Sequence, residues 1–282
     1  MKRTFLLLLS AFVTLSLQAQ EQNEAIHIDV HGTGNPILLI PGFTVPGEIW
    51  DPLVEKLKAD YECHVITLAG FGGKPPIAFP WLPKVNNALE QYIVDHDLED
   101  AIVIGHSIGG TIATWLASRE EVHLSKLILI DALPAAGEMM FPNFDPETLV
   151  YDSPFNNQQL AMSESNFDQL ATTMAMGMSL EPSAQNQIKN WMVQADRKTY
   201  VYGYTDYLKL DTRACLKEIS APVVILAAGK PYGDTMVRQT YTSQYANLAD
   251  YELIIAENSA HFIMLDQPEW FAEQIQAAVA SR

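Results

Sequence analysis

The hydrophobic positions change their period along the chain. Between residues 25 and 30, Ile26, Ile28 and Val30 alternate with polar residues, which is the pattern of a half-buried antiparallel strand. Short unbroken apolar runs follow, as expected for strands that are covered on both faces. These runs are Ile37–Ile40, Val65–Leu68, Ala101–Ile104, Leu127–Ile130, Val223–Ala227 and Leu253–Ile255.

Helical patterns lie between most of these runs. Apolar residues recur at three- and four-residue spacing in segments 49–57, 85–93, 108–116 and 270–279. Strands and helices in alternation predict an α/β fold, with a mostly parallel central sheet, right-handed crossovers and helices on both faces. Catalytic groups of such a fold are expected at the carboxyl ends of the strands.

Segment 135–213 breaks this rhythm, because it contains no short apolar run of the strand type. It holds seven of the ten methionines, a pliable filler of irregular apolar space, and the aromatic residues Phe141, Phe144, Phe155, Phe167 and Trp191. We interpret it as a helical cap inserted into a core of residues 20–134 and 214–282. Ordinary helical packing is the alternative.

Residues 1–19 have the pattern of a secretory signal peptide. Lys2 and Arg3 precede an apolar run from Phe5 to Leu17, which is too short to span a bilayer comfortably. Cleavage after Ala19 would release a soluble secreted or periplasmic protein, and an uncleaved membrane anchor is the alternative.

Charge and cysteine content narrow the possible partners. The chain has 17 Lys and Arg against 34 Asp and Glu, a net charge of -17, which disfavours binding to nucleic acid and to anionic membrane surfaces. Cys63 and Cys215 belong to different predicted elements, so we expect two separate thiols. The sequence does not indicate an oligomeric state.

The segment Gly105-His106-Ser107-Ile108-Gly109 follows one predicted strand and precedes a helix. This is the G-x-S-x-G pattern, in which a tight turn exposes the serine hydroxyl and side chains at either glycine would collide. The helix that follows aims free N–H groups at the same place. We therefore predict Ser107 as a nucleophile, and a plain turn residue is the alternative.

A serine hydroxyl needs a base to become a good nucleophile. His261 follows the last predicted strand, so it belongs to a loop at the same edge of the sheet. The other histidines lie in or beside strands and helices, or inside the turn itself: His27, His31, His64, His96, His106 and His123. His261 is the predicted base.

Three segments together resemble the α/β-hydrolase superfamily: the Ser107 turn, Ala260-His261-Phe262 and Ile40-Pro41-Gly42-Phe43. The resemblance implies the chain order nucleophile, acid, histidine. It also implies an oxyanion hole formed by the backbone N–H groups of Phe43 and Ile108. Pro41 and Ala260 depart from the family's usual residues, but neither change removes a catalytic group.

The resemblance also implies a carboxylate after the strand Val223–Ala227, where Tyr232 occupies the usual position. Asp234 lies two residues further and is the acid we favour, because a small bulge in the loop would accommodate it. Asp131, at the end of Leu127–Ile130, is the rival, since some members of the family take their acid from that strand. The predicted triad is Ser107, Asp234 and His261, with Asp131 open.

These residues predict an exported serine hydrolase that cleaves apolar acyl esters through an acyl-enzyme on Ser107. Such chemistry needs no metal and no cofactor. Carbon–carbon bond hydrolases, lactonases and peptidases use the same arrangement of residues and stay open. A non-catalytic ligand-binding protein on this fold is the alternative to an enzyme.

Overall fold

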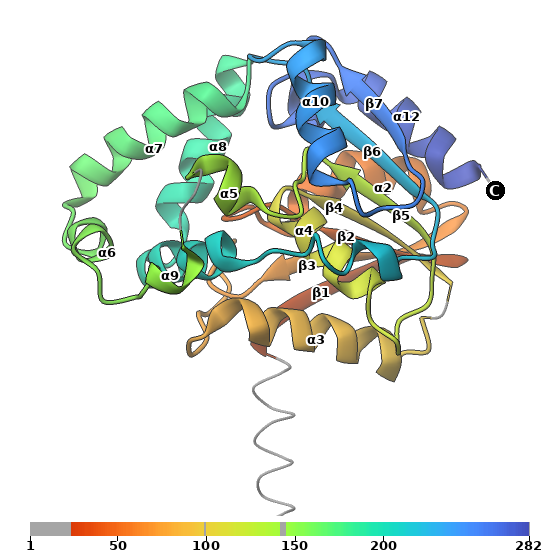
Figure 1. Cartoon of the computed structure of the whole chain (residues 1–282), viewed down its shortest axis with the longest axis horizontal. Helices are drawn as coiled ribbons and strands as arrows, with labels where there is room; N and C mark the ends of the chain where they lie inside the picture. The colour runs from red at the N-terminus through yellow and green to blue at the C-terminus, as the bar shows by residue number, and fades with distance from the viewer. Residues whose placement is uncertain (1–23, 99, 142–144, 282) are drawn as a thin grey trace, which may run out of the picture.

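The computed structural model describes residues 24–98, 100–141 and 145–281, so the predicted signal peptide and Phe144 lie outside the described residues. The predicted α/β fold is confirmed: the strands form a seven-stranded sheet in the order β1-β3-β2-β4-β5-β6-β7 (Figure 1). The strands are β1 (Ile26–Gly32), β2 (Asn35–Ile40), β3 (Tyr61–Leu68), β4 (Ala101–His106), β5 (Leu124–Ile130), β6 (Val223–Ala228) and β7 (Glu252–Ala256).

The pairing of the strands decides which loops meet. Only β1 runs antiparallel, against β3, and the remaining pairs are parallel. In the register of β4 against β5, His106 lies opposite Ile130. The residues that follow these two strands therefore emerge side by side at one edge of the sheet.

Helices cover both faces of the sheet. Alternate residues of each strand point to opposite faces, so apolar side chains pack against helices on both sides. Leu38 and Ile40 belong to one buried cluster, and Ile37 and Leu39 belong to another. The first cluster includes α3 (Trp81–Asp95), α4 (Ile108–Ala117) and α10 (Asp234–Gln244); the second includes α2 (Asp51–Leu57) and α12 (Pro268–Ala280).

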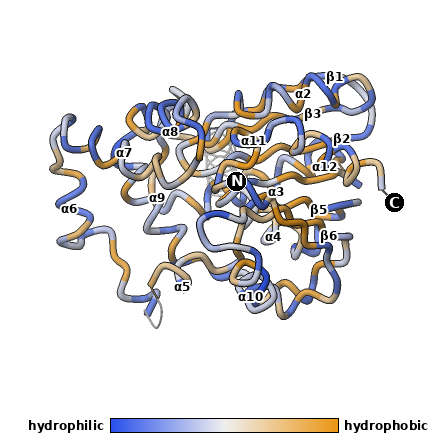
Figure 2. The backbone as a smooth tube through the Cα atoms, turned by 90° about the horizontal axis from the view of Figure 1, so that it is seen from above, coloured by the Kyte–Doolittle hydropathy of each residue, from blue (hydrophilic) through white to orange (hydrophobic). Residues whose placement is uncertain are grey.

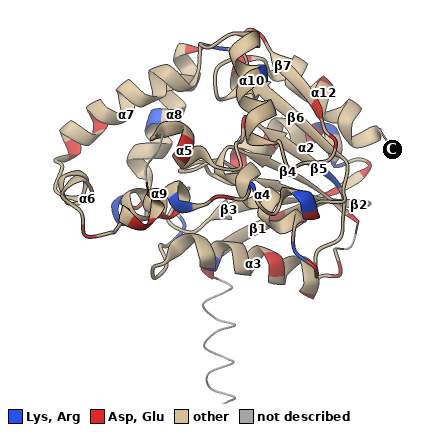
Figure 3. Ribbon diagram, viewed as in Figure 1, with Lys and Arg blue, Asp and Glu red and all other residues tan. Residues whose placement is uncertain are grey.

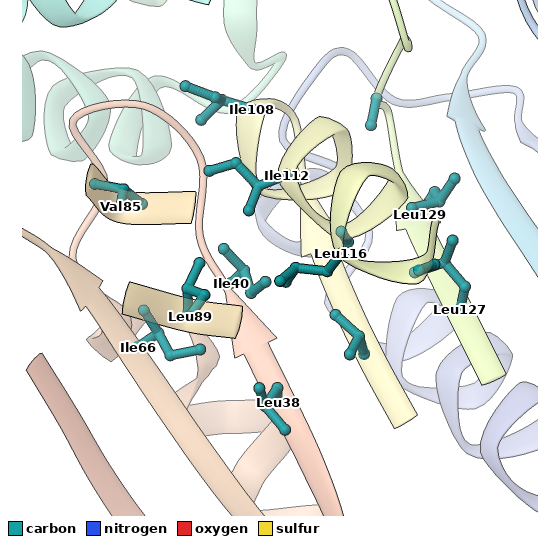
Figure 4. Close-up of a cluster of buried hydrophobic side chains, with 14 of the residues drawn as sticks. Leu38, Ile40, Ile66, Val85, Leu89, Ile108, Ile112, Leu116, Leu127 and Leu129 are labelled. Carbon is teal, nitrogen blue, oxygen red and sulfur yellow. The ribbon is translucent and has the colours of Figure 1, made fainter. Parts of the chain in front are cut away.

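The helix that follows Ser107 is anchored by its apolar face. Ile108, Ile112 and Leu116 of α4 belong to one buried cluster with Ile40 of β2 and Leu129 of β5 (Figure 4). All five side chains are fully buried, and each contributes about 1.5–3 kcal/mol by leaving water. This packing holds the start of α4, and with it Ser107, against the sheet.

Segment 135–213 contains helices that stand beside the sheet in Figure 1: α5 (Ala136–Met140), α6 (Pro154–Leu160), α7 (Glu164–Met178), α8 (Pro182–Gln194) and α9 (Arg197–Lys209). Local capping starts several of them. The side chains of Ser153, Ser163 and Asp196 accept hydrogen bonds from backbone N–H groups in the first turns of α6, α7 and α9. Hydrophilic and hydrophobic residues mix along these helices (Figure 2).

Two smaller features complete the architecture. Short helical turns precede α2 and α12, namely η1 (Gly47–Trp50) and α11 (Ile263–Asp266). Cys63 and Cys215 are free thiols, as predicted, and burial raises the pKa of Cys63 to about 11. In the part of the chain that the structure describes, no helix is long and apolar enough to cross a membrane.

Candidate active site

Ser107 lies in a strained turn between β4 and α4. Its φ is 54° and its ψ is -123°, a conformation that costs a residue with a side chain about 1–3 kcal/mol. The flanking glycines are required by space: a Cβ on Gly105 would lie 2.4 Å from the carbonyl oxygen of Gly109, and one on Gly109 would lie 2.4 Å from that of Ile40. The predicted role of both glycines is confirmed.

The loop of Pro41, Gly42 and Phe43 passes directly against Ser107. A Cβ added to Gly42 would lie 3.5 Å from the Cβ of Ser107. Among the described turns, loops and helix ends, neither Phe43 nor Ile108 donates its backbone N–H to a carbonyl group. Ile108 is the first residue of α4, where backbone N–H groups lack a partner within the helix. Both predicted oxyanion donors are therefore free to bind an oxygen.

His261 is paired with Asp131. Its Nδ1 lies 2.6 Å from Oδ2 of Asp131, and because a carboxylate accepts, Nδ1 carries the hydrogen. The other carboxylate oxygen, Oδ1, accepts hydrogen bonds from the backbone N–H of Ala228 at 2.9 Å and from the hydroxyl of Tyr241 at 3.0 Å. Three donors thus hold the carboxylate, and Nε2 of a neutral His261 keeps a lone pair.

The surroundings of Asp131 keep it ionised. Burial by itself would raise the pKa of this carboxyl, but the hydrogen bond and charge of His261 and the donors Ala228 and Tyr241 outweigh it and hold the pKa below its usual range. A carboxylate that stays charged can fix the orientation of the imidazole and stabilise its protonated form.

The prediction that Asp234 orients His261 is corrected by this geometry. Asp234 begins α10 as an exposed residue, and its carboxylate lies 3.6 Å from the guanidinium of Arg238. The backbone of the loop after β6 reaches the loop of His261, where Lys230 donates to the carbonyl oxygen of Ser259 at 2.9 Å, but Tyr232 at the family's usual acid position is 73% exposed. Asp131 is placed by register, because β5 lies directly beside β4.

His106 supports His261 from below. Its Nε2 donates a hydrogen bond of 3.0 Å to the backbone carbonyl of His261, and the two ring centroids are 4.7 Å apart. Burial, with a smaller contribution from the charge of His261, lowers the pKa of His106 to about 3, so this ring is neutral. This contact leaves no signal in the sequence, where His106 appears only as part of the turn.

Tyrosines of α9 form an aromatic wall opposite the turn. The rings of Tyr200 and Tyr204 lie 6.0 and 5.5 Å from that of Phe43. Tyr207, one turn further, is buried near Ser107 and Thr111, and burial raises its pKa to about 12, so its hydroxyl stays protonated.

The spacing of the three tyrosines by four and three residues places them on one helix face, which is the signal in the sequence that could have predicted this wall. Of the aromatic residues that the sequence singled out, Phe155 is 64% exposed, and Phe167 is fully buried against Tyr200 with ring centroids 5.0 Å apart. Trp191 is buried, and Phe141 is 48% exposed. Within segment 135–213, the aromatic rings that contact Phe43 therefore belong to another helix, α9.

A serine on a tight strand-to-helix turn, a histidine from the last loop and a carboxylate that holds it define a site of the α/β-hydrolase class. The chain belongs to the alpha/beta hydrolase family, whose model matches residues 37–274. It is a hydrolase of that family.

Curated relatives and solved structures agree with this assignment. The chain is 25% identical over 257 residues to a pimeloyl-[acyl-carrier protein] methyl ester esterase of Vibrio vulnificus strain YJ016, with 89% of this chain and 96% of the relative covered. The relative of that name from Vibrio cholerae is 26% identical over 262 residues, with 89% and 96% covered.

The solved structures show the same fold. The esterase EaEST from Exiguobacterium antarcticum superposes with a TM-score of 0.74 at 20% identity, covering 92% of this chain and 98% of its own. An enol-lactonase from Burkholderia xenovorans LB400 has a TM-score of 0.74 at 15% identity, with 91% and 96% covered.

Proposed function

We propose that the chain is a serine hydrolase that cleaves esters through an acyl-enzyme on Ser107. The pair of His261 and Asp131, held at 2.6 Å beside the strained turn of Ser107, is the observation that carries this proposal. Serine hydrolysis needs a base whose second nitrogen is oriented by a carboxylate, and this pair supplies one. The names of the curated relatives, which are ester hydrolases, support the same reaction class.

The proposed reaction runs in two halves. Nε2 of His261 takes the proton of Ser107 as its oxygen attacks the ester carbonyl, and the N–H groups of Phe43 and Ile108 bind the resulting oxyanion. The intermediate expels the alcohol, which receives the proton from His261, and leaves an acyl-enzyme. Water then attacks the acyl group, giving its proton to His261, which returns it to Ser107 as the acid leaves. Throughout, Asp131 stabilises the imidazolium.

We propose a small apolar ester as the substrate. The aromatic wall supports this, because the rings of Phe43, Tyr200 and Tyr204 offer apolar surface next to the turn. The curated relatives are named for an ester on an acyl-carrier protein, and a substrate held by another protein needs a docking surface with charges free to pair.

The Lys and Arg side chains of segment 135–213 already interact within the chain, and Figure 3 marks Lys and Arg positions in blue. Lys189 pairs with Asp168 at 2.7 Å, and the guanidinium of Arg197 lies 3.6 Å above the ring of Phe167. Lys198 lies near the rings of Phe79 and Tyr202. Lys209 donates to the carbonyl of Leu149. Arg213 pairs with Asp211 and Glu138. Because these cations already have partners within the chain, they favour a free ester as the substrate over an ester bound to a carrier protein.

Labelling with a fluorophosphonate probe tests the reaction. The wild type should react covalently, and Ser107→Ala should neither react nor turn over esters while keeping the wild-type circular dichroism spectrum. A wild type that resists the probe would favour the ligand-binding alternative, and a labelled Ser107→Ala would place the nucleophile elsewhere.

A substrate panel tests the proposed ester class. We expect kcat/KM to be highest for short to medium p-nitrophenyl esters, lower for lactones, and lowest for esters whose acyl chain ends in a carboxylate. Fastest turnover of the charged acyl chain would contradict the proposed substrate while leaving the triad intact.

We also propose that residues 1–19 direct export and are removed. The pattern of Lys2 and Arg3 before the apolar run supports this. Expression of the full chain in a Gram-negative host should give a periplasmic protein. Its intact mass should correspond to a chain that starts at Gln20. A full-length product in the cytoplasmic or membrane fraction would contradict the proposal.

A further inference from the structure

Two distant segments meet beside the candidate base. The histidine loop, residues 257–262, carries His261, and the cap turn, residues 179–181, joins α7 to α8. The backbone N–H of Phe262 donates to the carbonyl oxygen of Met178 at 3.0 Å, at the end of α7. The cap turn therefore contacts the same loop that presents His261.

One carboxylate, that of Asp266 in α11, bridges these segments. Its Oδ2 accepts from the backbone N–H of Ala260 at 2.8 Å and lies 3.3 Å from the hydroxyl of Ser259, both in the histidine loop. Its Oδ1 accepts from the hydroxyl of Ser179 at 2.5 Å and from the backbone N–H of Leu180 at 3.0 Å, both in the cap turn. Oδ2 thus binds the histidine loop, and Oδ1 binds the cap turn.

The bridge needs a group that accepts at both ends. Two of the donors are backbone N–H groups, of Ala260 and Leu180, and these can never accept a hydrogen bond. An ionised carboxylate has two accepting oxygens, whereas a carboxamide has one oxygen and an NH₂ group that only donates. An amide at position 266 would therefore set an N–H against an N–H in one of the two segments. Ser179 and Ser259 are almost fully buried, so water cannot readily replace the lost contact.

The bridge is also close to the reacting atoms. Ala260 directly precedes His261, whose carbonyl oxygen is held from the other side by His106 at 3.0 Å. The backbone of His261 is thus fixed between the bridge and the turn of Ser107. A displacement of about 1 Å in a catalytic group can cost about 10²-fold in rate.

We propose that Asp266 is a positioning residue: it aligns His261 with Ser107 by tying the histidine loop to the cap turn, so that the cap and the base move as one. The inference rests on the proposed function, because alignment has a measurable consequence only if His261 acts as the base. It assigns the cap a part in the chemistry as well as in substrate selection.

The test compares Asp266→Asn with the wild type on one p-nitrophenyl ester and with the fluorophosphonate probe. We expect kcat and the labelling rate to fall together by about 10- to 100-fold, with KM changed by less than about threefold because substrate contacts remain. Hydrogen–deuterium exchange should become faster in both the histidine loop and the cap turn.

Ser179→Ala is the milder variant, which removes one donor on the cap side and keeps both backbone contacts. It should lower kcat by about 3- to 10-fold, the value of one ordinary hydrogen bond. It also keeps the test decisive if Asp266→Asn fails to fold.

Asp206→Ala is the matched control, because an asparagine at this position could still accept from both backbone N–H groups on its one oxygen and donate to the hydroxyl of Tyr151. Asp206 also joins the cap to the core through a carboxylate, accepting from the backbone N–H groups of Trp81 at 2.8 Å and Leu82 at 3.1 Å at the start of α3. Loss of this bridge should lower Tm, with kcat within about threefold of the wild type when measured well below Tm.

Equal labelling rates in the wild type and Asp266→Asn, or in the wild type and Ser179→Ala where the first variant is unfolded, would overturn the positioning role. An equal loss of kcat in Asp206→Ala would overturn it too, because any weakened contact between the cap and the core would then suffice. A wild type that does not label at all refutes the proposed function instead, so the two failures are distinguishable.

Discussion

Two aspartates follow two neighbouring strands of the sheet and have opposite surroundings. Asp131, after β5, is held by His261, Ala228 and Tyr241, with its side chain 17% exposed. Asp234, beyond the end of β6, is 45% exposed and lies 3.6 Å from Arg238. Their chemistry is the same, so the difference shows that the path of each loop, and not the residue type, decides which carboxylate serves the histidine.

The difference follows from where the strands stand. β5 is next to β4, and Ile130 lies opposite His106, so Asp131 and Ser107 are each the first residue beyond this pair and lie at the same level. β6 is one strand further away, and its loop must turn back to reach the site. In this chain the loop continues into α10 instead, and Asp234 becomes the first residue of that helix. A carboxylate there also favours the helix start, since the N-terminal end of a helix attracts negative charge.

Exchange of each aspartate for asparagine should give the largest contrast. Asp131→Asn should lower kcat by about 10³- to 10⁴-fold, because the amide can hold His261 in the wrong tautomer and cannot stabilise the imidazolium. Asp234→Asn should stay within about twofold, as expected for an exposed side chain. Steady-state kinetics on one ester measures both.

The reverse result would restore the assignment made from the sequence. A loss in both variants would mean that the two loops act together. Circular dichroism at the assay temperature shows whether either variant has unfolded.

Buried His106, beside the pair of Asp131 and His261, makes the stability of the folded protein sensitive to acid. In the folded protein its pKa is about 3, against an ordinary 6.5. Below pH 6.5 the unfolded chain therefore binds a proton that the folded protein refuses, and stability falls as the pH falls toward 3. The loss from this group is about 2 kcal/mol between pH 7.5 and pH 5.

Urea unfolding of the wild type and His106→Gln at both pH values checks this contribution. The glutamine can still donate to the carbonyl of His261 but does not titrate, so its loss of stability should be smaller by that amount. Equal losses in the two proteins would show that His106 does not sense the pH.

Tyr241 sharpens the contrast on a smaller scale. Its hydroxyl donates to Oδ1 of Asp131 at 3.0 Å, and Tyr241→Phe removes this bond while keeping the ring. We expect kcat to fall by about 3- to 10-fold with little change in KM, since one hydrogen bond to the carboxylate is lost. An unchanged kcat would mean that His261 and Ala228 suffice to hold Asp131.

Arg238→Ala should give the smallest effect. The guanidinium is 55% exposed, and exposed pairs such as the one it forms with Asp234 contribute about 0–1 kcal/mol. Thermal unfolding should shift by no more than a few degrees, and kcat should stay within about twofold. A large loss of activity would show that the loop after β6 matters to the site in a way that its exposure does not indicate.

The sequence predicted the sheet and singled out Ser107 and His261 as candidates, because each depends on local pattern. Short apolar runs locate the strands, and the two glycines around Ser107 are demanded by a turn of five residues. The aromatic wall was harder to predict, because Tyr200 and Tyr204 reach Phe43 only after α9 has folded back across the sheet edge. The bridge by Asp266 joins residues more than eighty positions apart and leaves no local signal.

By itself, the sequence determined the α/β fold, the strained turn at Ser107, the free N–H groups that follow it and the histidine of the last loop. Tertiary structure alone decided which carboxylate pairs with His261, how His106 and Asp266 contact the loop of His261, and which tyrosines pack against Phe43. The physical reason is range: turns and strands follow from neighbouring residues, whereas a carboxylate acts on whatever the register of the sheet and the paths of the loops bring within hydrogen-bonding distance.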